Sequence, residues 1–251
     1  MIIESCENRN VIKISGTDRV SFLDRLVTNS IIDANLIYSA LLTPQGKYLN
    51  DFFILRRDND ILIDIDESFS QSFISKLTMY KLRADISLTI IDMPISQGQG
   101  ERPKYAFDDP RHPSLGWRAY GVKGQKIMTN WNQLYVDECI PRSGIELLPN
   151  ETYILEAGFE KLSGVNFKKG CYVGQEVTAR MKHKTKLKKG FSTVLINGSA
   201  PIGTKILSNE KDCGTLFSQS GGKAIAYLRY DRLSKNMHAG DATLSLIEPN
   251  H

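Results

Sequence analysis

The chain has 251 residues, 41% of them hydrophobic and 24% charged, which is enough for one large domain or two ordinary ones. Its formal net charge of +4 fits an anionic ligand or an acidic partner, but is too mild for a dedicated nucleic-acid binder. No apolar run approaches the roughly 20 residues of a membrane span, and the start MIIESCENRN resembles neither a secretory signal nor a transit peptide. We therefore expect no membrane association and a cytoplasmic location.

The first ninety or so residues alternate strand and helix patterns. Period-two apolar alternation predicts strands at 11–15 and 87–92, and a meander of three antiparallel strands over 39–66. Apolar stripes at helical spacing predict helices within 18–29 and 67–83. Helices packed on a mainly antiparallel sheet define an α+β fold.

The sequence pattern changes after the first ninety or so residues. Residues 93–116 are rich in Gly, Pro and charge, which predicts a long loop that ends in a short strand near Trp117. A short helix is expected within 131–140. Beyond residue 185, short alternating runs between Gly-rich turns predict a small β-barrel or sandwich. We expect two domains, 1–183 and 184–251.

The four cysteines lie far apart in the sequence. None forms a CxxC pair or a Cys/His pair at zinc spacing, which argues against a disulfide framework and against a self-contained zinc or iron–sulfur site. A metal or cluster would therefore be held with one ligand from this chain, as part of a shared site. The cysteines are Cys6, Cys139, Cys171 and Cys213.

Cys171 stands out by its neighbours. A lone cysteine is commonly a buried packing residue, but Gly170 and Gly174 allow another molecule to approach the backbone. Lys168 and Lys169 precede it, and positive charge favours the thiolate, the nucleophilic and metal-binding form. Cysteine-hydrolase chemistry is disfavoured, because no histidine lies in a recognisable pattern with this cysteine. The sequence predicts a reactive or ligating thiol.

A run of basic residues, RMKHKTKLKK, follows the cysteine. Its cations fall on every second position, so on a strand they would share one face. Such a stripe could be a solvated edge strand, or a docking surface for an anionic ligand, an acidic protein or RNA. No aromatic residues interleave with the cations, which weakens the case for base stacking. The stripe consists of Arg180, Lys182, Lys184, Lys186 and Lys188.

The segment KGCYVGQE resembles the signature of the YgfZ family, folate-binding proteins of iron–sulfur cluster assembly and repair. The matching positions are Lys169, Gly170, Cys171, Tyr172, Gly174, Gln175 and Glu176. The resemblance extends through ISGTDRVSFLDRLVTN, LLTPQGKYLNDFFIL, DPRHPSLGWR and GTLFSQSGGKAIAYLR. It implies the fold of the glycine cleavage T protein, an aminomethyltransferase, with an N-terminal folate-binding α+β domain followed by a small C-terminal β-barrel.

The resemblance also implies a tetrahydrofolate site. In the T protein, an aspartate faces the folate and a glutamate in a Leu-Glu-Ala-Gly context pairs with the pterin; Asp51 and Glu156 occupy these positions here. A carboxylate can accept two parallel N–H bonds from a 2-amino-pyrimidinone. Arg111 and Arg118 could meet the glutamate tail. Each of these charges could instead be an N-cap or a solvated ion pair. Asn50 replaces the first aspartate, which argues against retained one-carbon transfer.

The function implied is that of an accessory factor for assembly or repair of [4Fe–4S] clusters, with Cys171 as a thiolate and transient ligand, and with no permanent metal. Its partners would be folate and iron–sulfur carrier or client proteins, and we expect a monomer. Effects on tRNA modification would be indirect. Two alternatives remain open: a folate-dependent aminomethyl or methyl transferase, in which Asp51 matters and Cys171 does not, and an RNA-binding accessory of tRNA modification.

Overall fold

The computed structural model describes residues 3–32, 34–184 and 186–247. They form two compact units, each described by itself below. The first unit takes 1–128, 149–151 and 159–179; the barrel unit takes 129–148, 152–158 and 180–251. The chain thus passes from one unit to the other more than once, and the single boundary predicted at 183/184 lies near only the last of these crossings.

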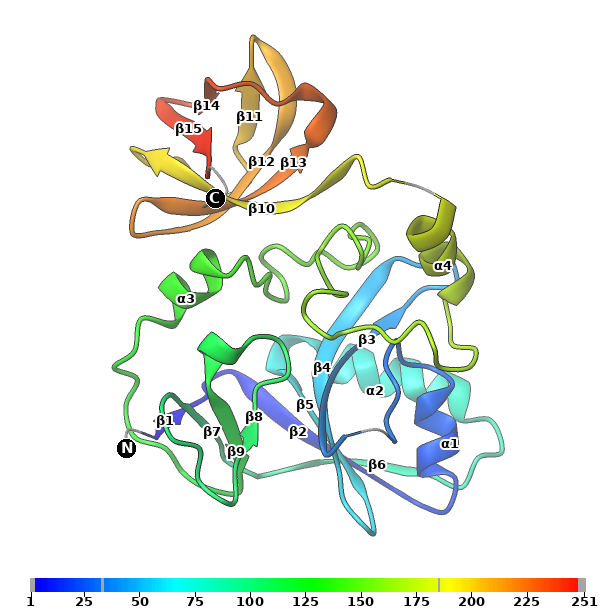
Figure 1. Ribbon diagram of the computed structural model, residues 1–251. Coiled ribbons are helices and arrows are strands. Elements are labelled where there is room, and N and C mark those ends of the chain that lie inside the picture. The colour runs from blue at the N-terminus through cyan, green and yellow to red at the C-terminus, as the bar shows by residue number, and fades with distance from the viewer. Residues whose placement is uncertain (1–2, 33, 185, 248–251) are drawn as a thin grey trace. The chain divides into compact units, whose positions relative to one another are not determined.

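An antiparallel sheet forms the centre of the first unit, in the strand order β3-β4-β5-β2-β6 (Figure 1). The predicted meander is confirmed, because β3, β4 and β5 pair in succession. The strands are β2 (Arg9–Ser15), β3 (Leu36–Leu42), β4 (Tyr48–Arg56), β5 (Ile61–Asp66) and β6 (Ser87–Ile91).

Helices α1 (Arg19–Asp24) and α2 (Glu67–Lys81) cover one face of this sheet. Because successive side chains of a strand point to opposite faces, every second residue of β4 faces the helices, and the Phe52 ring lies 4.8 Å from that of Phe73 in α2. Asp66 caps α2, accepting a hydrogen bond from the Ser68 amide. The main apolar core of the first unit lies between this face and the helices.

A second, smaller sheet in the first unit corrects the prediction of a long loop at 93–116. Its strands, in the order β1-β7-β9-β8, are β1 (Glu4–Ser5), β7 (Ile95–Gly98), β8 (Phe107–Asp108) and β9 (Trp117–Tyr120). A 3₁₀ turn, η1 (Pro113–Leu115), precedes β9. Strands of two to four residues are too short to show alternation. In addition, β1 near the N-terminus pairs with β7, which lies far along the sequence.

The barrel unit confirms the predicted C-terminal β-barrel. Its strands close in the order β10-β13-β12-β11-β14-β15. They are β10 (Lys189–Asn197), β11 (Lys205–Ser208), β12 (Lys211–Ser220), β13 (Lys223–Arg229), β14 (Met237–Ala239) and β15 (Ala242–Leu246). Helix α3 (Trp131–Asp137) belongs to the same unit, and η2 (Tyr230–Arg232) follows β13. Over the described ranges, no helix has the length and apolar character needed to cross a membrane.

Candidate functional site

The cysteine motif forms a loop in the first unit that ends where helix α4 (Gln175–Lys184) begins. Cys171 is exposed, whereas the side chains on either side of it are anchored. The Lys169 side chain is 3% exposed and the Tyr172 residue 7% exposed. The Lys169 ammonium lies 5.5 Å from the centre of the Tyr172 ring. The loop therefore presents the thiol to solvent from a fixed base.

Lys169 fixes the loop to the segment that follows α1. Its Nζ donates hydrogen bonds to the backbone carbonyls of Asp24, Val27 and Asn29 at 2.6, 2.8 and 2.9 Å, and lies 3.3 Å from Asp24 Oδ1. Burial lowers the pKa of this ammonium, against the opposing effect of Asp24. The sequence predicted that the Lys169 charge helps to stabilise a Cys171 thiolate. In the structure this ammonium binds backbone carbonyls, so Lys169 is a positioning residue.

Gly174 closes the loop against the turn that follows β3. Its φ is +83°, and a Cβ added there would lie 2.6 Å from the Thr43 carbonyl oxygen and 3.1 Å from Gly46 Cα. Only glycine combines this φ with so close an approach of two backbone segments. At Gly170, a Cβ would meet nothing within 4 Å. The two glycines of the motif therefore have different roles.

Cys171 should react with an alkylating reagent faster than the other three cysteines. It is exposed, Cys6 and Cys139 are partly buried and Cys213 is buried. Burial also raises the pKa of the Cys6 and Cys213 thiols, which lowers their thiolate fraction at neutral pH. Iodoacetamide labelling of the folded protein, followed by mass spectrometry, measures the order. Faster labelling of any other cysteine would contradict the assignment.

Replacing Lys169 with methionine should destabilise the protein by about 2–4 kcal/mol. The change removes charged hydrogen bonds and leaves backbone carbonyls without their donor. The matched control is the preceding residue, Lys168, which is exposed and whose replacement by methionine should stay within about 0.5 kcal/mol. Urea unfolding of both variants tests the pair, and equal effects would show that the buried ammonium is not what fixes the loop.

Asp51 lies on the face of the central sheet that is turned away from the helices. Its carboxylate accepts hydrogen bonds from the Tyr38 hydroxyl at 2.9 Å and from the Tyr48 hydroxyl at 2.6 Å, one on each oxygen. The residue is 7% exposed. Burial and the nearby Asp51 raise the pKa of Tyr38, so this phenol stays protonated and keeps its donor. The carboxylate is therefore held in one orientation.

The guanidinium groups of Arg111 and Arg118 stack over aromatic rings on the sheet face that carries Asp51. Arg111 stands 5.7 Å from the centre of the Tyr38 ring, and both guanidinium carbons lie over the Phe53 ring, at 4.8 and 4.2 Å. The structure thus brings Asp51 and the two predicted arginines together in one buried cluster of the first unit.

Each arginine is already paired with a buried carboxylate. Arg111 donates to both oxygens of Asp109, at 3.0 and 2.8 Å, and Arg118 donates to Asp64 at 2.7 Å. Burial raises the pKa of Asp64, but Arg118 and Arg9 more than offset this effect and hold it below its usual value. Their binding of a folate tail stays a prediction, and it would have to compete with these aspartates.

These residues fit part of a folate. The Asp51 carboxylate, fixed by two phenols, is the kind of acceptor that the N–H groups of a 2-amino-pyrimidinone require. Arg118 Nε is a buried donor that no described residue satisfies. The tail carboxylate, in contrast, finds no uncompensated charge at Arg111 or Arg118.

Glu156 belongs to the barrel unit, where it accepts a hydrogen bond from the Tyr227 hydroxyl at 2.6 Å. Burial and this carboxylate raise the pKa of Tyr227 far above its ordinary value, so that the phenol stays protonated. The Glu156 carbonyl also accepts from the Phe191 amide at 2.9 Å, which ties its backbone to β10. Its role in pterin binding stays a prediction.

The basic stripe predicted on a strand is wrong. Arg180, Lys182 and Lys184 lie in helix α4, where neighbours two apart in the sequence, such as Arg180 and Lys182, point about 200° away from each other. Lys186 and Lys188 precede β10, so no strand carries the five cations. The sequence QEVTARMKHK is made largely of good helix formers, and its alternating charges face no core that would require a strand. The cations therefore do not share the single strand face that the sequence predicted.

The sequence interpretation missed Asp64, Tyr38 and Tyr48. Asp64 is the buried partner of Arg118 and also accepts from Arg9 Nε at 2.6 Å. The pairing Tyr38–Phe53–Asp64 across β3, β4 and β5 places these three residues on one face, with Tyr38 one residue before the predicted meander. A charged residue alternating with isoleucines in ILIDID was the available signal.

Comparison with protein families matches the barrel first. Residues 188–251 match the family described as the CAF17 C-terminal beta-barrel domain. A fungal protein from Mycosarcoma maydis, named iron–sulfur cluster assembly factor IBA57 homolog, mitochondrial, is 28% identical over 72% of this chain and 54% of its own length. The chain thus spans about half the length of the fungal relatives it matches.

The animal relatives are covered more completely. Mouse IBA57 is 23% identical over 96% of this chain and 81% of its own length; human IBA57 is 23% identical over 92% and 78%. Both are named mitochondrial iron–sulfur cluster assembly factors. The expected cytoplasmic location is wrong on this finding. The resemblance to the YgfZ family in particular stays a prediction.

The fold is that of the aminomethyltransferase T protein. The crystal structure of this protein of the glycine cleavage system from Bartonella henselae superposes with a TM-score of 0.66, over 98% of this chain and 85% of that one, at 12% identity. The predicted fold class, a T-protein-like α+β domain followed by a small β-barrel, is therefore confirmed. An identity this low indicates shared architecture and carries no activity with it.

Proposed function

We propose that this chain is an iron–sulfur cluster assembly factor that presents the Cys171 thiol to a cluster or iron held by a partner. The observation that carries the proposal is the exposed thiol on a loop anchored by Lys169 and Tyr172. Relatives named as assembly factors support it, and their names also support a place of action in mitochondria. The partners would be iron–sulfur carrier or client proteins.

For the binding of iron or a cluster, the protein needs only to expose the Cys171 thiol to the partner. A thiol that binds iron loses its proton to solvent as the Fe–S bond forms, so metal binding itself completes the ionisation. Soft thiolate ligands suit iron–sulfur clusters, and one ligand from this chain leaves the remaining ones to the partner. A cluster held this way is cargo, because a shared ligand can leave without unfolding either protein.

A complementation experiment tests the proposal. A strain lacking its own factor is supplied with wild type, Cys171→Ala or the control Cys139→Ala, and the activity of a [4Fe–4S] enzyme is measured. We expect wild type and the control to restore activity and Cys171→Ala to fail at equal protein level and thermal stability. Equal restoration by Cys171→Ala would overturn the proposal.

We also propose that the protein binds tetrahydrofolate in the first unit, with Asp51 accepting hydrogen bonds from the pterin. The support is the fixed Asp51 carboxylate together with the T-protein fold. Titration calorimetry with the reduced folate should show binding that Asp51→Asn weakens, whereas Asp60→Asn, a control at a partly buried aspartate that pairs with Arg57, should not weaken it. Absence of binding near a millimolar ligand concentration would refute the folate proposal and leave the thiol proposal standing.

A further inference from the structure

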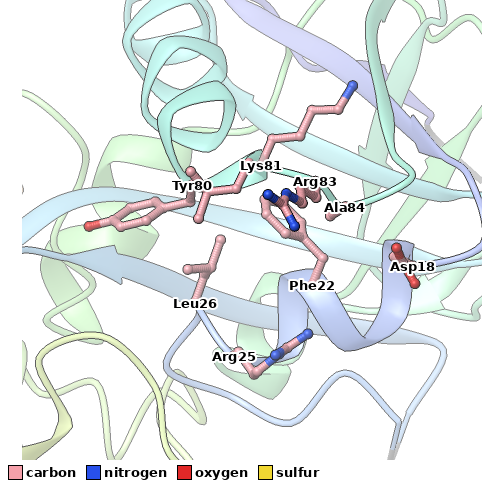
Figure 2. Close-up of a pocket in the computed structure, with 9 residues that line it drawn as sticks. Asp18, Phe22, Arg25, Leu26, Tyr80, Lys81, Arg83 and Ala84 are labelled. Carbon is pink, nitrogen blue, oxygen red and sulfur yellow. The ribbon is translucent and has the colours of Figure 1, made fainter.

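A groove opens on the first unit between helix α1 and the end of helix α2. Its volume is about 470 Å³. Figure 2 shows Phe22 standing on α1 and facing the end of α2, where Tyr80, Lys81 and Arg83 lie. The groove is remote in sequence from the cysteine motif, and neither the thiol nor the folate proposal uses it.

The groove combines an apolar floor with a cationic rim. Phe22 and Leu26 are 6% and 7% exposed and form the floor. Arg25, Lys81 and Arg83 stand around it, and none of the three forms an ion pair with any residue that the structure describes. Asp18 also lines the groove, where its carboxylate accepts a hydrogen bond from the Asp85 amide at 2.8 Å, and the Asp85 carboxylate interacts electrostatically with Lys81. With three cations and one carboxylate in its lining, the groove is net positive.

The backbone at the lip of the groove is strained. Leu82 follows α2 with φ +45° and ψ −106°, and the turn is closed by the Ala84 amide, which donates to the Lys81 carbonyl at 2.8 Å. This is the second position of a type II′ turn, where glycine is the usual residue. A leucine here is 89% exposed. Backbone strain of this kind clusters at functional surfaces.

We propose that this groove docks an acidic, amphipathic segment of the partner protein that exchanges the cluster; the inference rests on the proposed function. Such a segment would place apolar side chains on Phe22 and Leu26 and its carboxylates against Arg25, Lys81 and Arg83. Charge complementarity selects a partner segment of this chemistry, because the cations of the rim attract carboxylates and repel basic segments. Leu82 would be covered in the complex.

A photocrosslinking experiment identifies the occupant. The variant Leu82→benzoylphenylalanine is expressed in cells that depend on this protein, irradiated, and the crosslinked peptide is sequenced by mass spectrometry; Lys104→benzoylphenylalanine is the control. We expect Leu82 to label a segment that combines acidic and apolar residues. Labelling no stronger than at Lys104, labelling of a basic segment, or labelling of nucleic acid would overturn the proposal.

Binding measurements then test the charges. The crosslinked segment is synthesised and titrated against wild type, against the double variant Arg25→Glu/Arg83→Glu, and against the matched control Lys104→Glu/Lys126→Glu, two exposed cations of the same unit. We expect about tenfold weaker binding for the groove variant only, with the difference shrinking at high salt. Equal affinities for the three proteins would overturn the proposal.

Complementation separates this proposal from the one it rests on. If Cys171→Ala fails and the groove variant restores full [4Fe–4S] enzyme activity, the groove is not the docking site and the thiol proposal stands. If Cys171→Ala restores activity, the proposed function itself fails. A folded groove variant that loses activity, with its thermal unfolding unchanged, supports docking.

Discussion

Replacing Asp64 with alanine should lower the free energy of unfolding by about 3–5 kcal/mol. The carboxylate is 1% exposed and pairs with Arg9 at 2.6 Å and with Arg118 at 2.7 Å. Removing it leaves buried guanidinium charge without its partner, which is the costly way to break such a pair. Urea unfolding at neutral pH measures the loss.

The control for Asp64 is Asp60, an aspartate that also pairs with an arginine. Its partner Arg57 is 43% exposed, so solvent screens the pair, and Asp60→Ala should cost no more than about 1 kcal/mol. A similar cost for both variants would show that burial does not set the strength of the Asp64 pairs.

The pH dependence of the Asp64 effect has a defined sign. Because the folded pKa of Asp64 lies below its unfolded value, its contribution to stability is complete above the unfolded pKa of about 3.9. The contribution is lost as the pH falls through the folded pKa. The difference between wild type and Asp64→Ala should therefore be constant from pH 7 down to about 5 and shrink below pH 4.

Replacing Gly174 with alanine should destabilise the cysteine motif by about 2–4 kcal/mol. A left-handed φ of +83° costs an alanine about 1–2 kcal/mol, and the clash with the Thr43 carbonyl forces the loop away from the turn after β3. Because this contact fixes the base on which Cys171 stands, activity in the complementation experiment should fall with stability.

Gly170→Ala is the matched control within the same motif. A Cβ at this position meets nothing within 4 Å, so the substitution should stay within about 0.5 kcal/mol and leave activity intact. Thermal unfolding and the alkylation rate of Cys171 report on both variants. A harmful Gly170→Ala with a silent Gly174→Ala would reverse the roles that we assign to the two glycines.

Much of the fold follows from local patterns in the sequence. The central meander, both helices of the first unit and the barrel strands show periodicities that survive because each element has one buried face. The small second sheet does not, since its strands are too short and pair over long sequence separations. The basic run shows the opposite failure, where alternation without a buried face predicted a strand and a helix formed.

In the candidate site, too, features marked by local sequence could be predicted, and features that depend on distant contacts could not. Cys171 could be found from its neighbours because glycines and charge mark an exposed loop locally. What Lys169 does could not, since its acceptors lie more than 100 residues earlier in the chain. The pairing of Arg118 with Asp64 depends likewise on a contact between two sheets. The sequence shows which residue types are present, whereas the partner of each residue depends on the fold.

The barrel unit is built from segments that lie far apart in the sequence, and this has a consequence for folding during synthesis. Segment 129–148 belongs to that unit, and its Glu146 is 1% exposed and accepts from the Ser218 hydroxyl at 2.5 Å, while Lys223 pairs with Asp137 at 2.7 Å. On a ribosome, this segment emerges long before β12 and β13 exist, and its Val136 must wait without Phe217 and Ile225, against which it packs. Contacts of such long range fold slowly. A chaperone that recognises nascent chains would meet this protein at 129–148, and a fragment that stops at residue 183 would keep the exposed segment without the barrel that covers it.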